Sequence, residues 1–276
     1  MSTDSLPEIR EAEAPPAIAA IYAALNDGIG IGQVNLIWRH AAALPGVLDW
    51  LWAQAAPALA SGAAAAARDG IAAAIALPIP AVSPKPQDHA ALAAVVEIYN
   101  RGNLTNLAVL SAILLRAQGL APGERLAPAP RGAMLPAPPT LPRLAALPAA
   151  QQAQIRALTV AHGLSDAAVV PSLYLHLALW PEFLARLPEL LAPLQADRGL
   201  VRARDAAVAA ARHTAPGLIA ALGAAPAPPA RLPEFLTRLE VFVREVIPGM
   251  VPVGLFLRRA LATAPSGRSD DGFRFR

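Results

Sequence analysis

The sequence predicts an all-α fold made of two helical repeats related by a pseudo-twofold axis, and three observations support this prediction. First, the segment around His40 recurs around His176 at a constant offset of 136 residues, and long-period self-similarity indicates duplicated structure. Second, apolar residues recur with helical spacing. Third, no segment shows the alternating, β-branched pattern of a strand. The matched pairs are His40 and His176, Ala42 and Ala178, Pro45 and Pro181, Leu48 and Leu184, Leu51 and Leu187, Ala56 and Ala192, Pro57 and Pro193, and Trp38 and Tyr174.

The first predicted repeat spans residues 1–120 and begins with a helix over about Pro16–Ala24. The glycine-rich stretch Asn26–Gly32 matches neither a Walker A loop nor a GxGxxG motif, so we expect a loop that ends the helix. A short helix over Asn35–Leu44 follows. The next helix is expected to open at Pro45, because proline suits a first helical turn and disfavours helix for the residue before it.

The remaining boundaries follow from helical pattern and proline content. Helical character returns over Asp88–Gln118, with an expected interruption at Asn100–Asn103. The linker at 121–149 contains eight prolines, which favour an extended strap over a continuous helix. The second repeat is predicted at 150–265, and a disordered tail at 266–276.

The two helices that follow the proline corners each carry an apolar stripe at helical spacing. Such a stripe is typical of a helix that packs one face against a core. The stripe residues are Phe183, Leu184, Leu187, Leu190, Leu191 and Leu194 in the second copy, and Val47, Leu48, Leu51, Ala55 and Leu59 in the first.

The composition excludes several classes of function. The 276-residue chain has no cysteine, which removes disulfides, thiolate metal sites and thiol nucleophiles. The net charge of +3 comes from scattered arginines, with Lys85 the only lysine, so a nucleic-acid-binding face is not expected. No uninterrupted apolar run is long enough for a membrane helix, and the N-terminus does not resemble a signal peptide. We therefore expect a cytoplasmic protein without a metal or other cofactor.

His40 and His176 are candidate site residues because both copies of the repeat keep a histidine there. Apolar residues lie three or four positions from each, which places the imidazoles on or beside the inward face. One interpretation is a core histidine whose ring donates to a carbonyl of the following corner. The other is a titratable group in a pocket between the halves, where its pKa near neutrality suits proton transfer.

Asn103 and Asn106 form a second candidate group. One interpretation is structural, with Asn103 as the N-cap of a helix over Leu104–Gln118 and Asn106 in its first turn. The corresponding positions of the second half hold Val246 and Gly249. This asymmetry favours a ligand-binding interpretation, since an amide donates to a halide or a carbonyl and accepts from a water.

Further candidates come from charged and hydroxyl side chains near the two histidines. Arg39 beside Trp38 is either an outward arginine next to a core tryptophan, or a clamp whose guanidinium binds both oxygens of a carboxylate. Ser172 and Tyr174 are weaker candidates, with packing or surface roles as the alternative. Asp166 is the acid nearest the second motif, and a helix cap or solvated loop acid is its alternative.

Two short motifs resemble known families. VPSLYLHLALWPEFL resembles a helix-Pro-helix element of the alkylhydroperoxidase-D and carboxymuconolactone-decarboxylase superfamily, whose cysteine pair this chain lacks. Over most of its length the chain more closely resembles the cysteine-independent group I α-haloacid dehalogenases, which are similar to a tandem duplication of that unit. YNRGNLTNL, with Asn100, Gly102 and Asn103, resembles the Asn-x-Gly-Asn stretch of that family, and WPEFL and LPGVL resemble its two proline corners.

The resemblance implies a hydrolase in which an asparagine and an aspartate orient and deprotonate a water. The water then displaces halide from C2 of a 2-halo acid without a covalent ester. By motif, Asn103 would be the asparagine. Counting back from Trp180 and Pro181, the aspartate position falls at Leu173, which cannot accept a proton. The expected site therefore pairs Asn103 with a replacement base.

The replacement base is left open among Asp166, His176 and His40. The place of the family's pocket tryptophan is near Gln33, with Trp38 close by. The expected ligand is a small carboxylic acid held by Arg39 or by helix N-terminal amides. The full set of expected ligand-contacting residues is Trp38, Arg39, His40, Asn106, Ser172, Leu173 and Tyr174.

Two other functions remain open from the sequence. One is a non-catalytic or differently specific small-molecule-binding member of the same fold, which keeps the pocket without hydrolysis. The other is an α-helical interaction protein, which has no pocket between its halves. A homodimer is implied by the resemblance alone.

Overall fold

The computed structural model describes residues 6–80, 89–161 and 170–263, and within these ranges the chain forms helices and no strand. The predicted all-α class is confirmed. The predicted disordered tail lies outside the described ranges. The helices are α1 (Pro16–Ile29), α2 (Leu36–Ala42), α3 (Val47–Ala60), α4 (Ala63–Ala74), α5 (His89–Ala117), α6 (Ala149–Ala161), α7 (Ser172–Leu177), α8 (Pro181–Gln195), α9 (Gly199–Ile219), α10 (Leu232–Val241) and α11 (Ile247–Thr263), with 3₁₀ turns η1 (Glu11–Glu13), η2 (Leu144–Ala146) and η3 (Ala196–Arg198) and the π-helical turn η4 (Phe242–Val246).

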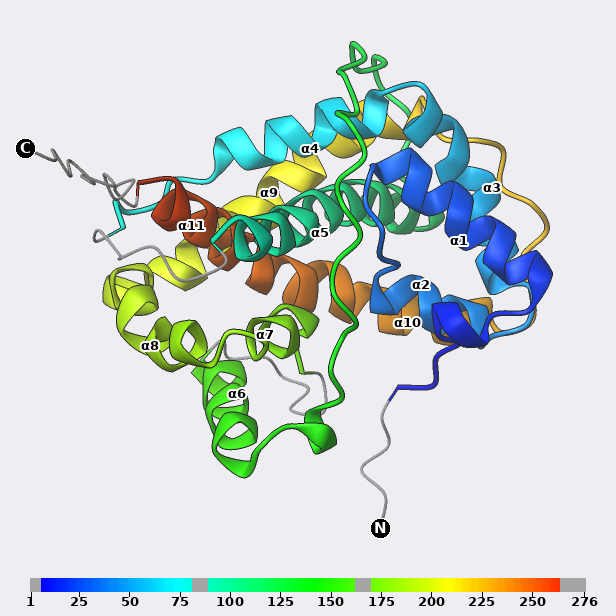
Figure 1. Ribbon diagram of the computed structural model, residues 1–276. Coiled ribbons are helices and arrows are strands. Elements are labelled where there is room, and N and C mark those ends of the chain that lie inside the picture. Colours follow the sequence, from blue (N-terminus) through cyan, green and yellow to red (C-terminus); the bar gives the residue numbers. More distant parts are fainter. Residues whose placement is uncertain (1–5, 81–88, 162–169, 264–276) are drawn as a thin grey trace, which may run out of the picture.

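Helix α5 runs through the middle of the molecule and packs against α4, α9 and α11 (Figure 1). It is continuous, so the expected interruption at Asn100–Asn103 is wrong. Gly102 lies inside the helix, where glycine costs about 1 kcal/mol relative to alanine. A Cβ there would lie 3.0 Å from Cδ1 of Ile31. The glycine therefore allows the connector between α1 and α2 to approach α5 closely.

The two halves of the sequence place their helices in a similar order. A short helix, α2 or α7, leads through a proline-containing corner into α3 or α8, and then into α4 or α9. Pro181 is the first residue of α8, as its position in the motif suggests. By contrast α3 begins at Val47 and not at Pro45, because Gly46 adopts a left-handed conformation with φ of 75°. The pseudo-twofold relation and the repeat boundaries remain predictions.

Buried apolar side chains form two clusters that do not follow the halves of the sequence. One cluster contains α1 to α4, the C-terminal part of α5, most of α9, and α10 with η4. The other contains α6 to α8 with the N-terminal part of α5. Helices α5 and α11 contribute to both clusters and therefore join them. The predicted stripes of α3 and α8 are all buried, namely Val47, Leu48, Leu51, Ala55 and Leu59, and Phe183, Leu184, Leu187, Leu190, Leu191 and Leu194.

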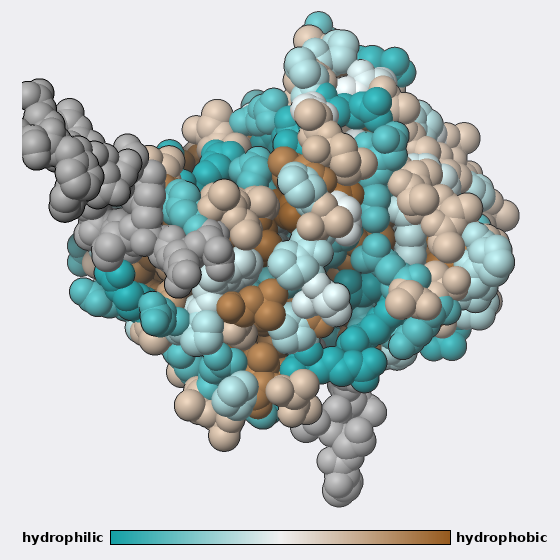
Figure 2. All heavy atoms as spheres, in the orientation of Figure 1, coloured by the Kyte–Doolittle hydropathy of each residue, from teal (hydrophilic) through white to brown (hydrophobic). Residues whose placement is uncertain are grey.

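The proline-rich segment between α5 and α6, which we call the strap, crosses one face of the molecule in an extended form (Figure 1). Its backbone is bound to the body, since Leu135 donates its amide N–H to the Gly30 carbonyl at 3.0 Å. Arg101 of α5 donates to the Ala133 carbonyl at 2.6 Å. Figure 2 shows hydrophilic and weakly coloured side chains over most of this face, with apolar side chains gathered near its middle.

No helix within the described ranges combines the length and the apolar character that crossing a lipid bilayer requires.

Candidate functional site

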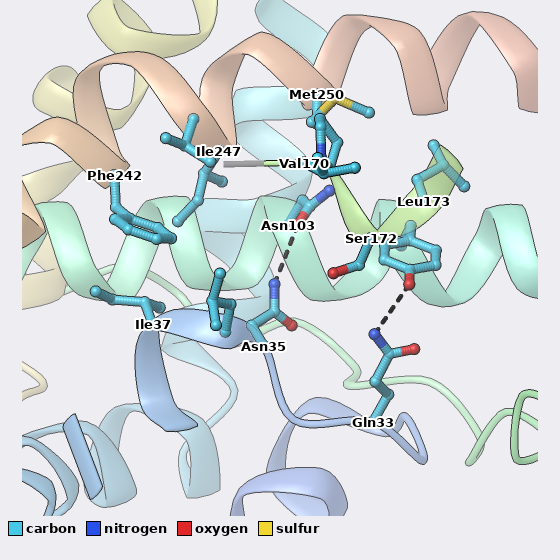
Figure 3. A pocket seen from close by; sticks show the side chains of 14 residues that line it. Gln33, Asn35, Ile37, Asn103, Val170, Ser172, Leu173, Phe242, Ile247 and Met250 are labelled. Atoms are coloured by element: carbon cyan, nitrogen blue, oxygen red, sulfur yellow. Dashed lines mark hydrogen bonds between the residues drawn. The ribbon is translucent and has the colours of Figure 1, made fainter. Parts of the chain in front are cut away.

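A small cavity lies where the connector before α2, the middle of α5, the start of α7 and the η4–α11 segment meet (Figure 3). Its volume is about 60 Å³. Most of its wall is apolar, with a few polar side chains from different segments. We call it the Asn103 cavity, and its lining residues are Gln33, Asn35, Leu36, Ile37, Tyr99, Asn103, Val170, Pro171, Ser172, Leu173, Phe242, Val246, Ile247 and Met250.

Asn103 presents its amide to this cavity from one face of α5. It lies mid-helix and not at a helix start, so its expected role as an N-cap is wrong. Its Oδ1 accepts a hydrogen bond from Nδ2 of Asn35 at 3.1 Å. That bond fixes the orientation of the amide, and Figure 3 shows the two side chains facing each other. With Oδ1 occupied, Nδ2 of Asn103 is the group left to donate to a ligand or a water.

Leu173 and Ser172, in the first turn of α7, also line the cavity. Leu173 is 1% exposed, so the residue at the position implied for the family's aspartate does share the cavity with Asn103. It contributes an apolar wall. Among the described residues of the lining there is no aspartate, glutamate, lysine, arginine or histidine, and Tyr99 is the titratable group.

His176 lies behind Tyr99 and not on the wall of the Asn103 cavity. The Tyr99 hydroxyl and Nδ1 of His176 are 2.7 Å apart, and their rings meet edge to face. The other ring nitrogen, Nε2, is 2.8 Å from the carbonyl oxygen of Pro139 in the strap. Burial lowers the pKa of His176 below 6.5, opposed by the Pro139 hydrogen bond. Gln33 Nε2 donates to the Tyr99 oxygen at 3.0 Å.

His40 is also buried, but it lies apart from the cavity. Its Nδ1 is 2.8 Å from the carbonyl oxygen of Pro7, and its ring stacks on Phe235 with centroids 6.1 Å apart. The expectation that each histidine donates to the following corner is wrong, because the carbonyls come from the N-terminal segment and the strap. Burial also lowers the pKa of His40, and the bond to Pro7 partly offsets this.

Trp38 and Asn106 bond to each other in the core and do not line the cavity. The indole Nε1 donates to Oδ1 of Asn106 at 2.7 Å, and both residues are 1% exposed. Nδ2 of Asn106 has no hydrogen-bond partner among the described residues. A buried indole N–H requires an acceptor, and this requirement accounts for a buried asparagine at this position of α5.

Arg39 is buried and does not reach the cavity. Its guanidinium donates to Glu8 at 2.8 Å and to the Val34 carbonyl at 2.7 Å. Glu8 also pairs with Arg10 at 2.9 Å. The interpretation of Arg39 as an outward-facing arginine is therefore wrong. The carboxylate that the guanidinium groups of Arg39 and Arg10 bind is that of Glu8.

A second, more open depression of about 440 Å³ lies between the N-terminal segment and the strap. We call it the strap groove. His176 and Gln33 reach its wall from the side of the Asn103 cavity, and Gln33 lines both spaces. Its wall is formed by Arg10, Glu11, Ala12, Glu13, Gly32, Gln33, Arg39, Pro138, Pro139, Thr140, Leu141, Arg143 and His176.

Tyr174 does not line the Asn103 cavity. Tyr174 is fully buried in the core, and burial strongly raises the pKa of its hydroxyl. Asp166 lies outside the described residues. The structure thus brings Asn103, Ser172 and Leu173 together on the wall of one cavity. His176 lies behind this wall and is in contact with Tyr99.

Sequence reasoning did not select Tyr99 or Asn35 as site residues. A signal for Tyr99 was present, because residues four apart lie on the same helix face and Tyr99 precedes Asn103 by four. Asn35 gave no such signal. It comes from a connector, and its contact with Asn103 depends on how closely that connector approaches Gly102.

No group of three or more histidine, aspartate or glutamate side chains in the described part of the chain is arranged to hold a metal ion.

No known family profile matches the chain, and no curated protein matches it in sequence. Solved structures do match. A D-2-haloacid dehalogenase mutant superposes with a TM-score of 0.76 at 16% identity, covering 95% of this chain and 97% of that one. A D-2-haloacid dehalogenase mutant in complex with D-2-CPA gives 0.72 at 15% identity, covering 96% and 98%. The complex of D-2-haloacid dehalogenase with L-LA gives 0.74 at 16% identity, covering 95% and 98%.

At these identities the similarity establishes the fold. The chain has a fold like that of the D-2-haloacid dehalogenases over nearly its whole length. The group I assignment, the relation to the alkylhydroperoxidase-D unit and the homodimer remain expectations.

Proposed function

We propose that the protein is a hydrolase of the 2-haloacid dehalogenase type, which binds a small 2-halo carboxylic acid in the Asn103 cavity. The observation that carries this proposal is the small, mostly apolar cavity with the Asn103 amide and the Ser172 hydroxyl on its wall, within a dehalogenase-like fold. A water molecule needs roughly 10–15 Å³ of such space. A cavity of about 60 Å³ therefore suits a ligand with few atoms, such as 2-chloropropionate.

The wall offers groups for each part of this ligand. Apolar side chains such as Ile37 and Phe242 surround C2 and its substituent. Nδ2 of Asn103 donates to the attacking water or to the ligand, and its bond to Asn35 holds the amide in place. Water attack at C2 forms a C–O bond and breaks the carbon–halogen bond. The halide leaves with the bonding electrons, and the proton of the water must pass to a base.

Without a described cation in the lining, the carboxylate is bound by neutral donors, so we expect weak binding. At a ligand concentration ten times Kd, binding stabilises the folded state by about 1.4 kcal/mol. For a chain of this size that is roughly a 3–6 °C rise in Tm. Thermal unfolding with and without 2-chloropropionate measures this rise.

Halide release from the two enantiomers of 2-chloropropionate tests the hydrolytic activity. We expect release by the wild type and a loss of about 10²-fold on Asn103→Ala, the typical effect of removing one positioned donor. Asn26→Ala is the matched control, because Asn26 is an asparagine on α1 outside the cavity. Equal release by Asn103→Ala and by the wild type would contradict the assigned role of Asn103.

Leu173 favours a second candidate function, a small-acid-binding protein that does not hydrolyse its ligand. Its apolar side chain occupies the cavity where the resemblance implies an aspartate base. The variant Leu173→Asp separates the two functions, with Leu173→Asn as the uncharged control of similar size. Halide release by the wild type supports the hydrolase. A silent wild type that shows the thermal shift, together with an active Leu173→Asp, supports the binding protein.

A further inference from the structure

A chain of hydrogen bonds links the Asn103 cavity to the strap groove. Tyr99 lines the cavity, and its phenol oxygen is 2.7 Å from Nδ1 of His176. His176 lines the groove, and its Nε2 is 2.8 Å from the Pro139 carbonyl oxygen. Both rings are buried, with 7% exposure for Tyr99 and 1% for His176. The two side chains thus form a continuous polar path through a largely apolar wall.

The hydrogen-bond partners fix the position of each proton along this path. A carbonyl oxygen accepts and cannot donate, so Nε2 of His176 carries a hydrogen. With a pKa below 6.5, the ring is neutral near pH 7, and Nδ1 is then a free acceptor. The Tyr99 hydroxyl therefore donates to Nδ1. Gln33 Nε2 donates to the Tyr99 oxygen, and Ser172 lines the same cavity as Tyr99.

We propose that Tyr99 and His176 form a proton relay that replaces the carboxylate base missing at Leu173; this inference rests on the proposed hydrolytic function. As the cavity water attacks C2, its proton passes to the Tyr99 oxygen, directly or through the Ser172 hydroxyl. The proton of Tyr99 moves at the same time to Nδ1 of His176. The carbon–halogen bond breaks and the halide leaves. After the product leaves, the Nδ1 proton returns through Tyr99 to water in the emptied cavity, which restores the neutral ring with its hydrogen on Nε2.

Water attack requires a group that accepts a proton near neutral pH, and no single residue of the described lining is such a group. Asparagine and serine side chains do not accept a proton near neutral pH. Burial strongly raises the pKa of Tyr99, so a persistent tyrosinate is disfavoured. In the relay Tyr99 is neutral before and after transfer, and the charge resides on His176. A positioned general base contributes about 10²- to 10⁴-fold in rate.

The surroundings of His176 contain both signs of charge. The relay partner from α5 is Tyr99, and the charged groups that share the groove with His176 come from the N-terminal segment, α2 and the strap. They are Arg10, Glu11, Glu13, Arg39 and Arg143. Arg10 and Arg39 are both paired with Glu8, so positive and negative charges lie side by side in the groove. Burial is therefore the main cause of the lowered pKa of His176.

The pH dependence of halide release tests the relay. We expect kcat/KM of the wild type to fall below pH 6.5, as His176 becomes protonated in the free enzyme. His176→Gln keeps a donor for Pro139 and an acceptor for Tyr99 but cannot take up a proton. It should lose about 10²- to 10⁴-fold in rate, together with the decrease at acidic pH. Tyr99→Phe should lose a similar factor, because it interrupts the path.

His40→Gln is the matched control, since His40 is an equally buried histidine that does not reach the cavity. It should keep both the rate and the acidic decrease. If the wild type releases halide while His176→Gln retains its rate and pH profile, the relay is overturned and the proposed function stands. If the wild type releases no halide from either enantiomer, the proposed function fails and the relay falls with it.

Nitrogen NMR of histidine-labelled protein provides a readout that does not depend on activity. At pH 7.5 we expect His176 to carry its proton on Nε2, with an unprotonated Nδ1 whose resonance shifts in Tyr99→Phe. A His176 ring protonated on Nδ1, or a resonance unaffected by Tyr99→Phe, would overturn the relay regardless of the halide assay.

Discussion

Two asparagines three positions apart on α5 illustrate how position on a helix decides the role of a residue. Asn103 faces the cavity and binds Asn35, whereas Asn106 is fully enclosed and accepts the indole N–H of Trp38. The same side chain is available for a ligand at one position and committed to the core at the other.

We predict that Asn106→Ala destabilises the protein by roughly 1–3 kcal/mol, because it leaves the buried Trp38 N–H without an acceptor. Guanidinium denaturation measures the change. Asn103→Ala is the comparison, since its amide lies at the cavity, and it should cost less stability. Equal losses for the two variants would contradict the different roles assigned to these residues.

Arg39 shows how a candidate binding residue can be engaged by its own chain. Its guanidinium is buried against Glu8 and the Val34 carbonyl. Removing one partner of a buried ion pair is costly because the other charge remains desolvated. The pair therefore holds the N-terminal segment against α2. The described lining of the Asn103 cavity contains polar side chains but no arginine or lysine.

At the scale of elements, the crossing of α5 and α11 is set by a glycine. Asn100 of α5 donates from Nδ2 to the Gly254 carbonyl of α11 at 3.0 Å. A Cβ at Gly254 would lie 2.4 Å from Oδ1 of Asn100. The absence of a side chain thus allows the two long helices to approach closely beside the cavity.

We predict that Gly254→Ala destabilises the protein by about 1–3 kcal/mol, the usual cost of overpacking a core. Gly70→Ala is the matched control on the exposed surface of α4, where the new Cβ would meet Thr214 Cγ2 at an ordinary 3.7 Å. This control should be neutral or stabilising by up to about 1 kcal/mol. Thermal unfolding of the two variants compares them directly.

For the whole molecule, the two buried histidines make stability depend on pH. Burial is the main cause that lowers the pKa of His40 and of His176 below 6.5. The unfolded chain therefore takes up protons at a higher pH than the folded chain does. The free energy of unfolding is then highest above pH 6.5 and falls as the pH decreases from 6.5 towards the lowered pKa values.

Denaturation at pH 7.5 and at pH 5 measures this effect. The double variant His40→Gln and His176→Gln should lose much of the difference between the two pH values. His213→Gln serves as the control because His213 is exposed, and it should keep the full difference. A wild type that is equally stable at both pH values would contradict the prediction.

The sequence by itself determined the helical class, the buried stripes of α3 and α8 and the proline corner before α8. These features follow from local periodicity, from the backbone limits of proline and from short motifs. Such signals lie within a few turns of one helix. They can therefore be read without knowledge of the fold.

Tertiary structure alone decided the rest. Four features depend on segments that are far apart in the sequence. They are the close approach of Ile31 to Gly102 in the continuous helix α5, the carbonyl partners of the two histidines, the Trp38–Asn106 bond and the link from Tyr99 to His176. Glycine in a helix and a buried polar side chain are each unfavourable locally. They are stable here because a distant segment supplies close packing or a hydrogen bond, and no local pattern records which segment that is.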